Sequence, residues 1–244
     1  SPSTASGCDG RVRRAREAGE PMLTVVSAWA TEAGAALGQV TTDEGEGEVS
    51  AIPRLLALLD LSGCIVTIDA AGCQSDIAKQ ITAAGGNYVF ALKGNQASLR
   101  DDAQEWLFEA TLDGRVDAFE TSERGHGREE TRRYWSVAVP EDAARALLWP
   151  GLQSVGMVEA SRTAGGETTT MQRLFASSLA PDAEALARAV RGHWGVENGL
   201  HWSLDVSFGE DQSRARVAHA AANLAAARRV ALTLLKAETT AEGG

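Results

Sequence analysis

The stretch C-I-V-T-I-D-A-A-G-C-Q-S-D-I-A-K-Q-I-T-A-A-G-G-N-Y-V-F-A-L, Cys64–Leu92, decides the fold. Its first part, Cys64–Ala70, is a continuous apolar run, typical of a strand buried on both faces of a parallel sheet. Gln74–Ala84 has helical spacing, and Asn87–Leu92 is a second buried strand. Strand, helix and strand in this order predict a βαβ unit with a right-handed crossover, and hence an α/β fold.

Similar elements flank this unit. Leu23–Ala30 is a β-branched run that predicts a strand, with Ala35–Thr42 as its hairpin partner. Val49–Leu61 and Ala97–Leu112 have apolar residues at helical spacing. Residues 1–8 carry no strand or helix pattern.

Residues 113–180 differ from the rest, because they alternate between polar and apolar positions. The alternating segments are Arg132–Val139, Ser154–Ser161 and Met171–Ser178. They predict an inserted, mostly antiparallel β region. From Pro181 onward the pattern is helical, over Asp182–Asp205 and about Ser213–Lys236. We therefore expect residues 1–112 and 181–244 to form one core, interrupted by a β-rich insertion at 113–180.

The composition limits the class of protein. With 44% apolar residues in 244, a sizeable core is expected, in one large or two small domains. No long apolar run or signal peptide is present, so we expect a cytoplasmic protein without a membrane partner. Three cysteines without a C-x-x-C pair argue against a disulfide framework or a structural zinc site. The net charge of −10 argues against coating of nucleic acid by bulk charge, but it allows a local basic groove.

The stretch R-G-H-W-G-V-E-N-G-L-H-W-S-L-D-V-S-F-G-E-D, Arg191–Asp211, carries the strongest signal for chemistry. On an α-helix, its residues His193, Glu197, His201 and Asp205 recur every four positions and form one polar stripe that drifts by about 40° per step. Apolar residues fill much of the remaining surface. A carboxylate among them is costly unless it is paired or holds a metal. Glu197 is therefore the first candidate, with an ion pair to Arg191 or a histidine as the plain alternative.

Two aspartates are further candidates. Asp69 follows the apolar strand of the βαβ unit, and ligand chemistry in α/β sheets lies at the carboxyl ends of strands. Its alternative role is to cap a turn. Asp9, in C-D-G-R, lies near the start of the chain, and its alternative role is that of an ordinary surface residue.

Taken together, these residues match a known family. The chain resembles the IS4-like DDE transposases, and more closely the ISAs1-type, H-repeat-associated transposases. The matching motifs are D-G-R at Asp9–Arg11, V-S-A-W-A at Val26–Ala30, I-P-R-L-L-A-L-L-D-L-S-G at Ile52–Gly63, I-V-T-I-D-A-A-G-C-Q at Ile65–Gln74, A-L-K-G-N-Q at Ala91–Gln96, H-G-R-E-E-T-R at His126–Arg132, and the whole of Arg191–Asp211.

The resemblance implies an RNase H-like mixed sheet flanked by helices. In that fold the first and fourth strands lie side by side and carry the two aspartates, and a late helix supplies a glutamate. Here these are Asp9, Asp69 and Glu197, which would hold two Mg²⁺ or Mn²⁺ ions for strand cleavage and transfer on DNA. The resemblance also implies a homodimer in the active complex.

Other matched residues are expected to contact DNA. This set comprises Lys93, Asn95, Gln96, Arg124, His126, Arg128, Arg132 and His193. The arginines have a plain alternative, a solvated charged hairpin, and His193 can instead be structural or orient Glu197. We expect Asp205, Glu210 and Asp211 to pair with Arg214 and Arg216.

The chain departs from the family near its start. The residues before Asp9 are S-T-A-S-G-C rather than a hydrophobic strand, so we expect the first strand to be short or missing, as in an N-terminally truncated copy. Three alternatives also stay open: an inactive DNA-binding remnant, an RNase H-like nuclease, and a zinc or di-iron site on H-x₃-E-x₃-H-x₃-D.

Overall fold

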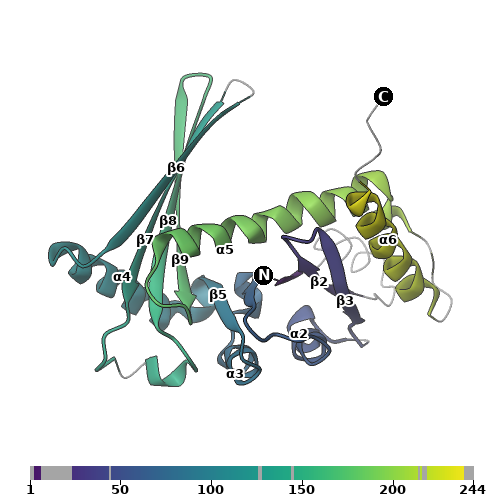
Figure 1. The fold of residues 1–244 in the computed structure, drawn as a ribbon, viewed down its shortest axis with the longest axis horizontal. Coiled ribbons are helices and arrows are strands. Elements are labelled where there is room, and N and C mark those ends of the chain that lie inside the picture. The colour runs from purple at the N-terminus through teal and green to yellow at the C-terminus, as the bar shows by residue number, and fades with distance from the viewer. Residues whose placement is uncertain are drawn as a thin grey trace. The chain divides into compact units, whose positions relative to one another are not determined.

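A computed structural model describes residues 3–6, 24–43, 45–125, 128–143, 146–213, 215 and 219–238. Within these ranges, the side chains of residues 3–6, 128, 197, 198 and 211 are not described. The chain is mixed α/β, with a mixed sheet flanked by helices (Figure 1). It divides into two compact units: unit 1 is Ser1–Thr67 with Arg191–Gly244, and unit 2 is Ile68–Val190.

Unit 1 contains a sheet in the order β3-β2-β1-β4. The strands are β1 (Ser3–Ser6), β2 (Val25–Ala30), β3 (Ala35–Thr41) and β4 (Ile65–Ile68), whose last residue falls in unit 2. Strand β2 is antiparallel to both β1 and β3. Residues 1–8 have no strand pattern, yet Ser3–Ser6 pairs with Ser27–Ala30, so the first strand is present and short, at four residues. Backbone hydrogen bonds to the apolar strand β2 therefore extend a segment that has no strand pattern of its own.

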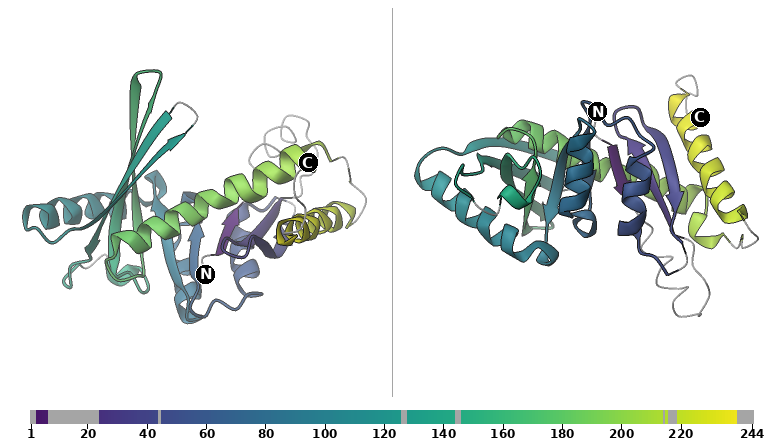
Figure 2. Two further views of the ribbon diagram at one scale, coloured as in Figure 1. Left: turned by 45° about the horizontal axis from the view of Figure 1, so that its top comes forward. Right: turned by 90° about the horizontal axis from the view of Figure 1, so that it is seen from below.

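Two helices cover opposite faces of β2 and β3 in unit 1 (Figure 2). Helix α2 (Glu48–Leu56) packs against the face that carries Gly38, where an added Cβ would lie 3.7 Å from the Leu55 side chain. Helix α6 (Ala220–Ala237) packs on the other face, and Gln39 donates to its Ala222 carbonyl at 2.9 Å. Both faces of the hairpin are thus used for packing, which explains the full burial of β2.

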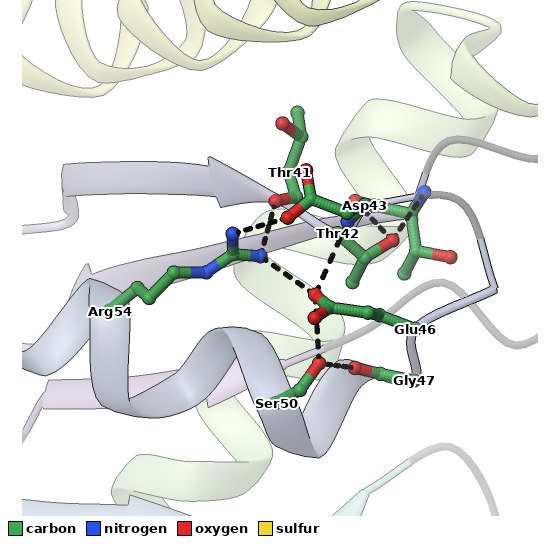
Figure 3. A network of polar contacts seen from close by, with 8 residues as sticks. Thr41, Thr42, Asp43, Glu46, Gly47, Ser50 and Arg54 are labelled. Atoms are coloured by element: carbon green, nitrogen blue, oxygen red, sulfur yellow. Dashed lines mark hydrogen bonds and ion pairs between the residues drawn. The ribbon is translucent and has the colours of Figure 1, made fainter.

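A polar network fixes the connection between β3 and α2 (Figure 3). The Arg54 guanidinium contacts Asp43 at 3.0 Å, Glu46 at 3.3 Å and the Thr41 carbonyl at 2.9 Å. Ser50 in the first turn of α2 donates to Glu46 at 3.3 Å. Because these groups are solvent-exposed, each ion pair contributes less than about 1 kcal/mol, and the network sets geometry more than stability.

Unit 2 holds a second sheet region in the order β5-β9-β8-β7-β6. Its elements are α3 (Ser75–Ala83), β5 (Asn87–Leu92), α4 (Ala97–Leu112), β6 (Asp117–Gly125), β7 (Arg128–Ala138), β8 (Ser154–Ala164) and β9 (Glu167–Ser177). All four pairings in this order are antiparallel. Strand β9 pairs directly with β5, so the alternating region continues the sheet that begins with β5.

Strands β6 to β9 form a long ribbon that extends past α4 (Figure 1). Helix α4 contacts β7, β8 and β9. The start of the next helix, α5 (Ala183–Val196), packs on Gly156 of β8, where an added Cβ would collide with Leu186 and with the Trp135 carbonyl. Asp117 of β6 accepts a 2.6 Å hydrogen bond from the Ala183 N–H at the start of α5.

The helical segment after α5 changes its geometry. The α-helical pattern ends at Val196, and two π-helical turns follow, at Glu197–His201 and Ser203–Ser207. A π turn closes on the fifth residue rather than the fourth, so the predicted stripe at steps of four does not keep its α-helical alignment beyond Glu197. In the described part of the chain, no helix combines the length and apolarity that crossing a membrane requires.

Candidate active site

Asp69 lies directly after β4, at the carboxyl end of that strand. Its backbone is extended, and its Oδ1 accepts a 3.2 Å hydrogen bond from the Gly72 N–H, which caps the short 3₁₀ turn Ala70–Gly72. The capping alternative is therefore what the local geometry shows. The side chain is exposed, and no donor among the described residues contacts its Oδ2. One carboxylate oxygen of Asp69 therefore fixes the turn.

The loop that follows Asp69 is held by two side-chain amides from the end of β5. Asn95 Nδ2 donates to the Ala70 carbonyl at 2.7 Å, and Gln96 Nε2 donates to the Cys73 carbonyl at 2.8 Å. Both donors lie in or beside the 3₁₀ turn Gly94–Gln96. Their amides are thus engaged with protein backbone, which favours a role in positioning the Asp69 loop over the expected DNA contact. Lys93 beside them is exposed.

Cys73 closes the loop beneath Asp69 and is fully buried. Burial raises the pKa of its thiol to about 12, so the group stays neutral and unreactive near neutral pH. Burial also raises the pKa of the neighbouring Tyr88 hydroxyl, and Cys73 adds a smaller coulombic effect. These two residues therefore act as packing beneath the loop.

The segment that carries Glu197 is anchored by its apolar side. Val196, Leu200 and Leu204 recur every four residues and are buried with Trp29 and Leu232 in one cluster of unit 1. The apolar residues expected around this segment do not all pack in the core, because Trp194 and Trp202 are exposed. Glu197 begins the first π turn, and its side chain is outside the described part. π turns inside helices are frequent at functional sites.

His193 contacts strand β4. Its Nδ1 lies 3.3 Å from Thr67 Oγ1, and both residues belong to unit 1. Thr67 is two residues before Asp69, and His193 is four before Glu197. The contact connects β4, which leads to Asp69, with α5, which leads to Glu197. The Nδ1 atom of His193 therefore has a structural role.

A buried ion pair holds the chain that follows the π turns. Arg229 of α6 donates to Glu210 Oε1 at 2.9 Å and to Ser27 of β2 at 2.7 Å, and both charged side chains are at most 5% exposed. Arg229 is thus a partner of Glu210 that the sequence did not predict, and the predicted pairing of Glu210 with Arg214 or Arg216 stays a prediction. Arg214 and Arg216 lie outside the described residues. A buried pair of this kind needs all its hydrogen bonds, and Arg229 also donates to the Ala225 carbonyl at 3.0 Å.

Lys236 is a cation that the sequence reasoning missed. Its Nζ lies 5.1 Å from the centre of the Trp29 ring, and 3.0 Å from the position of an added Cβ on Gly199 in the first π turn. The spacing of Arg229, Leu232 and Lys236 places all three on one face of α6, which is the signal that could have found it. Lys236 thus places a positive charge beside Gly199, which is two residues after Glu197 in the chain.

Three arginines of the β6–β7 hairpin are paired with glutamates. Arg124 contacts Glu129 at 2.9 Å, and Arg132 contacts Glu130 at 2.5 Å. Arg133 contacts Glu120 at 2.7 Å, and this hydrogen bond, with the coulombic attraction of the same carboxylate, raises the pKa of the guanidinium. These contacts agree with the alternative role of the arginines, that of a solvated charged hairpin. His126 and the side chain of Arg128 lie outside the described part.

The described residues test the metal site only in part. They contain no group of three or more histidine, cysteine, aspartate or glutamate side chains that could hold a metal. Asp9 lies outside the described part, as does the side chain of Glu197, so the predicted trio is represented there by Asp69 alone. An exposed carboxylate oxygen on a braced turn fits Mg²⁺, which prefers hard oxygen ligands and retains water.

The chain belongs to the family described as "Transposase DDE domain", whose family model matches residues 8–234. Within this superfamily it is an IS4-like, ISAs1-type transposase, related to the H-repeat-associated proteins.

Two relatives illustrate this similarity. The "H repeat-associated putative transposase YhhI" of Escherichia coli K12 is 37% identical over 228 residues, which cover 91% of this chain and 60% of the relative. The "Uncharacterized protein in dhlA 3'region" of Xanthobacter autotrophicus is 41% identical over 162 residues, 66% of this chain and 54% of the relative. The chain thus spans about 60% of the length of the first relatives that it matches.

One solved structure is also similar, a piggyBac transposase synaptic complex with hairpin DNA. The similarity covers 99% of this chain and 55% of the piggyBac chain, with a TM-score of 0.40 and 8% sequence identity.

Proposed function

We propose that this chain supplies the catalytic domain of a DDE transposase, which performs metal-dependent strand cleavage and strand transfer on DNA at the ends of an insertion sequence. Asp9, Asp69 and Glu197 are its proposed metal ligands and catalytic residues. The observation that carries the proposal is the position of Asp69, an exposed carboxylate at the carboxyl end of a buried strand. The loop that follows it is held by hydrogen bonds from the Asn95 and Gln96 side-chain amides. The family match over residues 8–234 includes all three carboxylates.

The order of the strands supports an RNase H-like core. Strands β1 and β4 are neighbours in unit 1. Asp9 comes three residues after the end of β1, and Asp69 comes directly after β4. Two aspartates that follow adjacent strands suit a shared cation, provided that both strands end at the same sheet edge.

Each group has a distinct task in the proposed chemistry. Two Mg²⁺ or Mn²⁺ ions, when bound, would activate the attacking hydroxyl and stabilise the leaving oxygen of an in-line displacement. The three carboxylates would hold them as hard oxygen ligands. Asn95 and Gln96 keep the Asp69 loop in place, while Lys93, His193 and Lys236 are the proposed cationic or polar contacts to phosphate. We further propose that the active species is a homodimer on DNA in the bacterial cytoplasm.

The test is a nicking assay on supercoiled DNA with millimolar Mg²⁺ or Mn²⁺. We expect the purified chain to nick DNA, and Asp69→Asn, Glu197→Gln and Asp9→Asn each to lower the rate by at least about a hundredfold, while circular dichroism remains unchanged. The matched control is Asp76→Asn, an exposed carboxylate in the first turn of α3, which should keep full activity.

Other products would point to other functions. DNA binding without metal-dependent cleavage would identify an inactive DNA-binding remnant. Cleavage without strand transfer to a second DNA would identify an RNase H-like nuclease. Tightly bound zinc or iron in the purified protein would revive the H-x₃-E-x₃-H-x₃-D site, which the described residues do not support.

A further inference from the structure

One edge of the β6–β9 ribbon is open. Strand β9 pairs with β8 over its whole length, Glu167–Ser177, but with β5 only through Leu174–Ser177. Among the strands that the structure describes, none pairs with the outer edge of Glu167–Arg173. Residues 167–172 are all exposed. The open edge therefore runs for seven residues, from the Gly165-Gly166 turn to the first pair with β5.

The middle of this edge lacks the features that protect sheet edges in monomeric proteins. Natural edges carry charges, prolines or bulges that block pairing with another chain. The core of the open edge, Thr168–Gln172, reads T-T-T-M-Q and contains none of these. The opposite edge of the ribbon, β6, carries four charged residues, Asp117, Glu120, Glu123 and Arg124. The contrast indicates that one edge is protected against a partner strand and the other is not.

The turn fixes which backbone groups face outward. Ala164 and Glu167 close a two-residue turn whose glycines both have positive φ, and such a closing pair exchanges hydrogen bonds with each other. The backbone groups of alternate residues then point away from β8. On the open edge these are Thr168, Thr170 and Gln172. They form an evenly spaced row of donors and acceptors.

We propose that two copies of this chain associate by antiparallel pairing of these edges, about a two-fold axis at Thr170. This register uses the full open edge, because Thr170 is the midpoint of Glu167–Arg173. It sets Thr168 opposite Gln172 of the partner subunit, which are both outward-facing residues. It also sets Glu167 opposite Arg173 of the partner subunit, so the edge is complementary in charge to itself.

The ribbon presents a row of hydroxyls that this pairing would continue. Ser122, Thr131, Ser161 and Thr170 lie side by side across the four strands. Ser122 and Thr131 are 3.4 Å apart at their hydroxyl oxygens, and Ser161 and Thr170 are 3.1 Å apart. Pairing at Thr170 would extend the row into the second copy, where cross-strand hydroxyl contacts again favour the sheet.

The first test measures association of the purified chain by sedimentation velocity, without DNA or metal. We expect a dimer that dissociates on dilution. Thr170→Lys places two like charges opposite each other at the two-fold axis, and it should raise the dissociation constant by about tenfold or more. Ser122→Lys is the matched control, since Ser122 lies in the same hydroxyl row at the protected edge; it should leave the dissociation constant unchanged.

The second test exchanges charges. Glu167→Arg alone and Arg173→Glu alone should each weaken the dimer by about tenfold, because each creates two like-charge pairs. An equimolar mixture of the two variants should associate as a heterodimer, since every pair is again of opposite charge. This recovery on mixing is a result that a folding defect in either variant would not produce.

The proposal names a surface for the homodimer in the proposed function, yet its test involves neither cleavage nor DNA. A wild-type chain that stays monomeric at high micromolar concentration would overturn it. So would a dimer that Thr170→Lys and Ser122→Lys weaken equally, or two charge variants that remain apart when mixed. Loss of nicking with an intact dimer would instead count against the catalytic assignment alone.

Discussion

The imidazole of His193 and the hydroxyl of Thr67 meet at 3.3 Å between Nδ1 and Oγ1, 126 residues apart in the chain. The threonine is buried in β4, immediately upstream of the residue pair Ile68-Asp69. The histidine lies one helical turn before Glu197. This contact joins the end of α5 to the strand that leads to Asp69.

The first prediction concerns this contact. Thr67→Val keeps the shape of the side chain but removes its hydroxyl, and we expect it to lower the free energy of unfolding by about 1 kcal/mol. His193→Ala should lower it by a similar or larger amount. In the double variant the two losses should not add, and the difference, about 0.5–1 kcal/mol, can be measured by urea unfolding. Fully additive losses would show that the two groups do not interact.

The second prediction concerns the buried ion pair. Arg229→Met removes the ion pair that Arg229 makes with the buried Glu210 carboxylate, so the free energy of unfolding should fall by about 3–5 kcal/mol. The double change Arg229→Met with Glu210→Leu should recover much of this loss, because no uncompensated charge remains. Arg188→Met breaks an exposed pair with Glu184 and should cost less than about 0.5 kcal/mol, which makes it the control. Equal losses for Arg229→Met and Arg188→Met would contradict the burial of the first pair.

The third prediction concerns the brace on the Asp69 loop. Asn95→Ala removes the 2.7 Å hydrogen bond to the Ala70 carbonyl and Gln96→Ala removes the 2.8 Å bond to Cys73. Hydrogen exchange of the backbone amides at Gly72 and Cys73 should then be about tenfold faster or more, since each lost bond is worth about 1–2 kcal/mol. Ser98→Ala, an exposed change at the start of α4, should leave these amides unchanged. Unaltered exchange in Asn95→Ala would show that the amide does not hold the loop.

The fourth prediction concerns pH. The Cys73 thiol has a pKa of about 12 in the folded chain and 9.0 as its ordinary value, so above pH 9 the unfolded chain loses a proton that the folded chain keeps. Stability should therefore fall as the pH rises above 9, by up to about 1.4 kcal/mol per pH unit from this group. Cys73→Ala should flatten this alkaline loss in urea unfolding at pH 8 to 10. A parallel loss in both proteins would assign the effect to other groups, and the buried Tyr88 hydroxyl, whose pKa is also raised, is the first of these.

The sequence predicted the strands and helices that have clear hydrophobic periods. Apolar runs such as Asn87–Leu92 and the helix Ala97–Leu112 match the structure at both ends. Strand β6 was missed because its residues, D-A-F-E-T-S-E-R-G, are mostly charged or small, and only pairing with β7 makes them a strand. The π turns were missed because a spacing of four residues cannot tell an α turn from a wider one.

The candidate site was predictable to a different extent. Motif resemblance identified the family, and Asp69 does lie at a strand end. Side-chain partners did not follow from the sequence, because Asn95 and Glu210 find theirs through tertiary packing. A basic residue beside a motif therefore predicted DNA contact for Arg124 and Arg132, although the structure gives both a glutamate neighbour.

The brace on the Asp69 loop also bears on how such domains diverge. Asn95 and Gln96 grip carbonyl oxygens, which every amino acid possesses, and not the side chains of Ala70 or Cys73. The side chains of the Asp69 loop can therefore change without loss of these hydrogen bonds, whereas replacing Asn95 or Gln96 removes a bond that holds the loop. Grafting the loop of a relative into this chain should thus be tolerated, while grafting a foreign segment over Lys93–Gln96 should require that its amides reach as far.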